Sequence, residues 1–112
     1  MIKFVESNDV LQDVISNYNK GEYRSEIFFF YHSNWDSYSK RVLNTILKEF
    51  ENSELEFFIV DMFEDPSMWR EFRPNTTPSL VILTDTGPKV QTIPQMINIT
   101  LEALSKKFCV EV

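Results

Sequence analysis

Two stretches of this sequence are apolar on both of their faces, and they limit the possible folds more than any other feature. The first is Ile27–Tyr31 and the second is Leu55–Val60. Such strands are typical of a sheet that is covered on both sides by helices. The segments around them carry apolar residues at helical spacing, for example Val42, Ile46 and Phe50. The pattern therefore predicts an α/β domain with a central sheet.

Strands and helices are expected along the whole chain, and turn and cap residues mark most of their ends. The expected elements are, in order, a strand over 2–5, a helix capped by Ser7 or Asn8, the strand Ile27–Tyr31, a helix from Asp36, the strand Leu55–Val60, a helix from Pro66, the strands Leu80–Leu83 and Lys89–Ile93, and a helix from Asn98. Gly21 suits the left-handed position that ends the first helix. We expect one domain over 1–112.

Composition excludes several classes of function. Net charge is −6, and the stretch 49–65 holds seven carboxylates and no Lys or Arg, which disfavours binding to nucleic acid or an anionic membrane. The single cysteine, Cys109, cannot form an internal disulfide and is expected to be an inert thiol. No apolar run reaches the ~20 residues of a membrane helix, and the N-terminus is too acidic for a signal peptide. We therefore expect a cytoplasmic protein.

Two short motifs point to a known family. The first is Trp35-Asp36-Ser37-Tyr38-Ser39-Lys40, directly after a buried strand, and the second is Thr77-Pro78-Ser79-Leu80. They resemble the active-site turn Trp-Cys-Gly-Pro-Cys-Lys and the cis-proline loop of the thioredoxin family. The resemblance implies a three-layer sandwich with a central mixed sheet of four to five strands, flanked by helices on both faces. It also implies a cis bond between Thr77 and Pro78. One departure is Pro94-Gln95-Met96, where the family has a glycine near its substrate groove.

The redox chemistry of that family cannot operate in this chain. Asp36 and Ser39 stand where the resemblance places the two cysteines, and dithiol exchange needs both thiols. Phe30 stands where the family has a buried aspartate that moves protons. We therefore expect no catalytic residue and no cofactor. Asp36 is expected to be a helix N-cap, and Ser39 is expected to lie on ordinary helix surface.

A binding role is compatible with these losses. In the family, the groove between the tryptophan turn and the cis-proline loop binds extended polypeptide by main-chain hydrogen bonds. Trp35, Tyr38, Thr77 and Pro78 would form that groove here, with an unidentified protein or peptide as partner. The simpler alternative is that Trp35 and Tyr38 only pack against neighbouring loops. Met68 and Trp69 are expected in the core.

Other functions have less support from the sequence. A glutathione- or thiol-cofactor-binding enzyme on the same fold could use the hydroxyl of Ser37, Tyr38 or Ser39, but such enzymes usually add a helical domain. An oxidoreductase acting through Cys109 alone is a third hypothesis.

Hydrolysis and metal binding are also disfavoured. A Ser-His-Asp set of Ser33 or Ser39 with His32 and Asp36 lacks the strained turn and the oxyanion donors of hydrolases. His32 has no Cys or second His near it, so we expect no metal site.

Overall fold

The computed structural model describes residues 2–23, 26–61, 64–74 and 77–92. In this part of the chain the elements are β1 (Ile2–Val5), α1 (Asn8–Asn19), β2 (Ile27–His32), α2 (Ser37–Phe50), β3 (Glu56–Asp61), the 3-10 turn η1 (Pro66–Met68), α3 (Trp69–Phe72), β4 (Ser79–Thr84) and β5 (Gly87–Thr92). The strands and helices follow the order that the sequence predicts. The expected helix from Asn98 lies outside the described residues.

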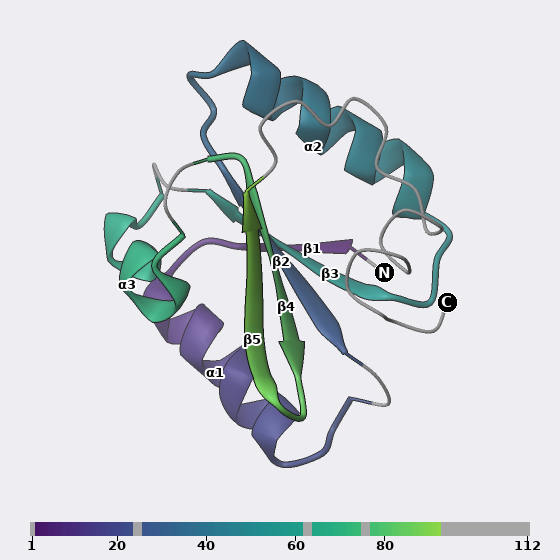
Figure 1. Ribbon diagram of the computed structural model, residues 1–112, viewed down its shortest axis with the longest axis vertical. Coiled ribbons are helices and arrows are strands. Elements are labelled where there is room, and N and C mark those ends of the chain that lie inside the picture. The colour runs from purple at the N-terminus through teal and green to yellow at the C-terminus, as the bar shows by residue number, and fades with distance from the viewer. Residues whose placement is uncertain (1, 24–25, 62–63, 75–76, 93–112) are drawn as a thin grey trace.

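The strands form one mixed sheet of five strands in the order β1-β3-β2-β4-β5 (Figure 1). β1, β3 and β2 run parallel to one another, whereas β4 is antiparallel to both β2 and β5. The two stretches that are apolar on both faces form β2 and, from Glu56 on, β3, which lie next to each other inside the sheet. In their register His32 lies opposite Asp61, at the carboxyl ends of both strands. The predicted mixed sheet is therefore confirmed.

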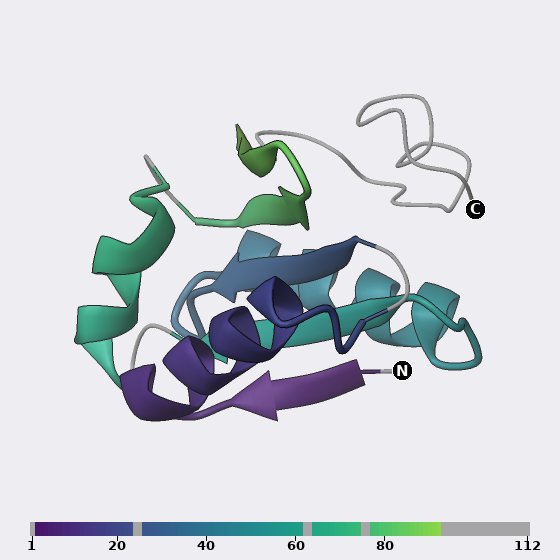
Figure 2. The same ribbon diagram turned by 90° about the horizontal axis from the view of Figure 1, so that it is seen from below.

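Alternate residues of β2 and β3 point to opposite faces of the sheet and build two separate cores. Phe28 and Phe30 of β2 pack under α2, while Phe29 and Tyr31 pack against the face that carries α1 and α3. Figure 2 shows α1 and α2 on opposite sides of the sheet. The α2 side is closed by Val42, Ile46 and Phe50, which are the residues that the helical spacing predicts. The structure therefore has the three layers that the resemblance implies.

Local signals set most element ends as expected. Ser7, rather than Asn8, caps α1, because its side chain accepts a hydrogen bond from the Val10 N–H. Gly21 follows α1 with φ +79°, a conformation in which a side chain would be strained. The helix predicted from Pro66 is instead a 3-10 turn followed by a single α-helical turn. In the described residues, no helix is both long and apolar enough to cross a membrane.

Candidate functional site

The turn between β2 and α2 contains the motif, and Asp36 begins the helix. The Asp36 carboxylate accepts a hydrogen bond from the Tyr38 N–H at 3.0 Å, and its carbonyl accepts the Lys40 N–H at 3.0 Å. Asp36 is therefore the N-cap of α2, as predicted. Trp35, just before it, is 63% exposed and is one of the few large hydrophobic side chains at the surface of the described residues.

The prediction that Ser39 lies on ordinary helix surface is wrong. Ser39 is fully buried, and its hydroxyl accepts a hydrogen bond from the Ser33 N–H at 3.0 Å. It lies three residues before Val42 and thus on the same inward stripe of α2. That spacing is visible in the sequence, but the polarity of a serine on a helix favours the opposite prediction.

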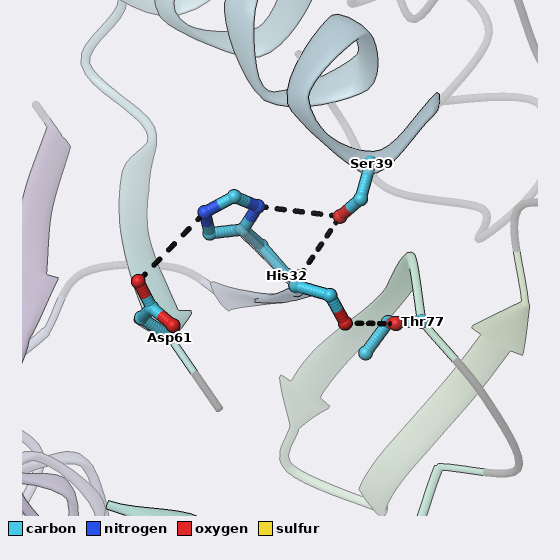
Figure 3. Close-up of polar contacts among 5 residues, drawn as sticks. His32, Ser39, Asp61 and Thr77 are labelled. Carbon is cyan, nitrogen blue, oxygen red and sulfur yellow. Dashed lines mark hydrogen bonds and ion pairs between the residues drawn. The ribbon is translucent and has the colours of Figure 1, made fainter. Parts of the chain in front are cut away.

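His32 forms the centre of a polar network that joins three elements (Figure 3). Its Nδ1 lies 3.2 Å from the Ser39 hydroxyl on α2, and its Nε2 lies 3.9 Å from an Asp61 carboxylate oxygen on β3. The acidic residue facing His32 is thus Asp61, not the Asp36 of the Ser-His-Asp set drawn from the sequence. Asp61 could have been found only from the β2–β3 register, because it is far from His32 in the chain.

The surroundings of His32 favour its neutral form. The residue is only 5% exposed. Loss of hydration on burial lowers the pKa of His32 below its usual 6.5, an effect that the Asp61 charge opposes and the Lys40 charge reinforces. The phenyl ring of Phe30 stacks 6.2 Å from the imidazole. A neutral imidazole has one donor and one acceptor nitrogen. It can therefore accept from the Ser39 hydroxyl at Nδ1 and present Nε2–H towards Asp61.

The cis-proline loop is joined to this network through Ser33. The Thr77–Pro78 peptide bond is cis, the isomer that the resemblance implies. The Ser33 and Thr77 hydroxyls hydrogen bond to each other across the gap between β2 and the loop (Figure 3). His32 and Ser33 are consecutive, so one dipeptide holds both the first turn of α2 and the cis-proline loop.

The structure places the residues of the predicted groove at different depths. Trp35 is exposed, Tyr38 and Thr77 are partly exposed, and Pro78 is buried. The Tyr38 ring packs partly against the core under α2, and the Arg41 guanidinium lies 6.0 Å from its centre. Any contact with a partner would thus be made mainly by the exposed Trp35 side chain and by the edges of Tyr38 and Thr77.

Three further residues for which the sequence makes a prediction, Phe30, Met68 and Trp69, contribute to the two cores. Phe30 is fully buried under α2, so an apolar ring fills the position of the family's aspartate. Met68 is buried and Trp69 packs against the same core, as predicted. Cys109 and the segment Pro94-Gln95-Met96 lie outside the described residues.

The side chains of Asp36 and Ser39 limit the chemistry that the site can perform, because neither residue carries a thiol. The Ser39 hydroxyl, although next to His32, is enclosed, so a substrate cannot reach it as a nucleophile. Within the ranges that the structure describes, no group of three or more His, Cys, Asp or Glu side chains is arranged to hold a metal ion.

Comparison with solved structures identifies the fold. A thioredoxin pre-protein from Schistosoma mansoni superposes with a TM-score of 0.74 over 96% of this chain and 97% of its own, at 12% identity. A mutant thioredoxin from Halobacterium salinarum gives 0.71 over 99% and 92%, at 15% identity. A thioredoxin from Trypanosoma brucei brucei gives 0.65 over 83% and 78%, also at 15%. No family model and no curated protein matches the sequence. The chain therefore has a thioredoxin-like fold.

Proposed function

We propose that this protein is a redox-inactive member of the thioredoxin-like fold that binds a protein or peptide through the Trp35 turn and the cis-proline loop. The observation that carries the proposal is that Trp35 is 63% exposed. It directly precedes Asp36, and neither Asp36 nor Ser39, which stand where the thioredoxin motif has its two cysteines, carries a thiol. Tryptophan is enriched among the residues that dominate binding energy at interfaces. Much of the Trp35 side chain contacts water, and burial of that apolar surface against a partner would be favourable.

The polar network supports a binding role rather than catalysis. Ser39 and His32 are used to hold the turn on the domain, and Ser33 holds the cis-proline loop. A binding surface gains affinity when its segments are held in place before the partner arrives. These hydrogen bonds keep the Trp35 turn and the cis-proline loop in a defined arrangement relative to each other.

The alternative, an enzyme that binds glutathione or another thiol cofactor, receives less support. Ser39 is enclosed, and its hydroxyl is already bonded to the Ser33 N–H, so it is a poor candidate for activating a thiol. Ser37 is exposed and Tyr38 is partly exposed. A calorimetric titration with glutathione tests this alternative, and heat that disappears in a Tyr38→Phe variant would favour it over peptide binding.

The proposed function is tested by affinity capture from the native host with quantitative mass spectrometry. The bait is compared with a Trp35→Ala, Tyr38→Ala double variant and with Phe4→Ala. Phe4 is a matched control, because it is an aromatic residue that is 58% exposed on the edge strand β1. We expect partners that are lost with the double variant and kept with Phe4→Ala. Partners kept by the double variant would refute the assignment of the surface.

A further inference from the structure

His32 is a buried titratable group next to the Trp35 turn. It is the only histidine of the chain, and it is buried between the first turn of α2, which follows the Trp35 turn, and the carboxyl end of β3. An apolar ring such as Phe30 fills a neighbouring position on the same strand. A buried polar group costs stability unless it is hydrogen-bonded, so its partners indicate what it does.

The hydrogen bonds of Ser39 depend on the charge of His32. Ser39 Oγ already accepts the Ser33 N–H, and its own proton can be donated to Nδ1 of the neutral ring, 3.2 Å away. In the imidazolium form both ring nitrogens are donors. Nδ1–H can then donate to the second lone pair of Ser39 Oγ, but the Ser39 proton loses its acceptor in a place without access to water, since Ser39 is fully buried. Protonation therefore leaves a buried donor unsatisfied at the contact between β2 and the first turn of α2, which costs stability there.

The charged groups around His32 offset this change only in part. Asp61 on β3 is the acidic group facing the ring, and it approaches only to 3.9 Å. Lys40 on α2 carries a positive charge that opposes a second one. On β2 itself the neighbour is the neutral Phe30 ring, and the cis-proline loop contributes the neutral hydroxyl of Thr77 through Ser33. The added charge is thus buried, and the Asp61 oxygen that faces it lies beyond hydrogen-bond distance of Nε2.

We propose that His32 is an acid-sensitive latch: its neutral ring holds the Trp35 turn through Ser39, and its protonation loosens the turn and weakens partner binding. The loosening of the turn rests on the unsatisfied Ser39 proton and the buried charge, whereas the loss of binding rests on the proposed function. The sign of the effect is set by linkage. Because burial lowers the pKa of His32 in the folded state, the folded state resists protonation. The latch is therefore closed above about pH 6.5, the pKa of His32 in the unfolded state. It opens as the pH falls through the lower pKa that His32 has in the folded state.

The test reads the turn directly and needs no partner. The chain has two tryptophans, so a Trp69→Phe variant leaves Trp35 as the only emitter. Its fluorescence is followed between about pH 7.5 and 5, and NMR follows the ring of the only histidine in the same samples. We expect one transition in both signals, with a shared midpoint below that of a free histidine. A Trp35 signal that stays constant while His32 titrates would overturn the latch.

Two further variants in the Trp69→Phe background separate the latch from general acid effects. In His32→Gln the Trp35 transition should disappear. In Ser39→Ala the His32 ring should still titrate, but the Trp35 emission should no longer follow it. A Trp35 transition that persists in both variants would overturn the proposal. Partner capture at about pH 7.5 reports separately on the proposed function: its absence there would refute binding without affecting the fluorescence result.

Discussion

Removal of the Ser39 hydroxyl is the perturbation whose effect the structure defines best. The Ser39→Ala change deletes the acceptor of the buried Ser33 N–H and the hydroxyl beside His32 Nδ1. A buried donor left without a partner costs about 1–3 kcal/mol. We therefore expect the free energy of unfolding to fall by about 2 kcal/mol. With a typical slope for a small domain, that is a decrease of about 1 M in the urea midpoint.

The matched control is Ser37→Ala, two residues earlier on the same helix. Ser37 is exposed at the first position of α2, so deletion of its hydroxyl should change stability by less than about 0.5 kcal/mol. Both variants are unfolded in urea and followed by circular dichroism, and their slopes are compared with that of the wild type. A Ser39→Ala midpoint equal to that of Ser37→Ala would refute the view that the buried network stabilises the turn.

Three other predictions concern capping, redox chemistry and acid stability. Asp36→Ala should cost about 1 kcal/mol because the cap of α2 is lost, while Asp36→Asn should cost much less; chemical unfolding of both variants checks this, and equal losses would contradict it. The protein should not accelerate reduction of insulin by dithiothreitol, and activity at thioredoxin level that survives Cys109→Ser would contradict the proposed function. Asp65 accepts hydrogen bonds from the Ser67 hydroxyl and from the Asn8 N–H that begins α1, and these lower its pKa below 3.8. Its contribution to the free energy of unfolding should thus be complete above the pKa of Asp65 in the unfolded state, and be lost as the pH falls through the lower pKa of the folded state. Acid unfolding should therefore depend less on pH in Asp65→Asn than in the wild type.

The sequence by itself determined the fold class and the loss of the dithiol site. Apolar residues on both faces of Ile27–Tyr31 can be satisfied only between two covering layers, and helical spacing placed Val42, Ile46 and Phe50 in one of them. Asp36 is a local feature as well, because an N-cap bonds to an N–H two residues ahead. Such short-range patterns depend on neighbouring residues in the chain, so the sequence contains the information needed to read them.

Only the tertiary structure decided what surrounds His32. Its carboxylate neighbour, Asp61, comes from a separate strand, and the pairing depends on the register of β2 and β3, which no local pattern determines. The prediction for Ser39 was wrong because a serine on a helix is polar in isolation, whereas its burial depends on the sheet beneath α2. Burial and long-range pairing are properties of the packed layers, and they turn an ordinary histidine and serine into a network that joins the turn to the sheet.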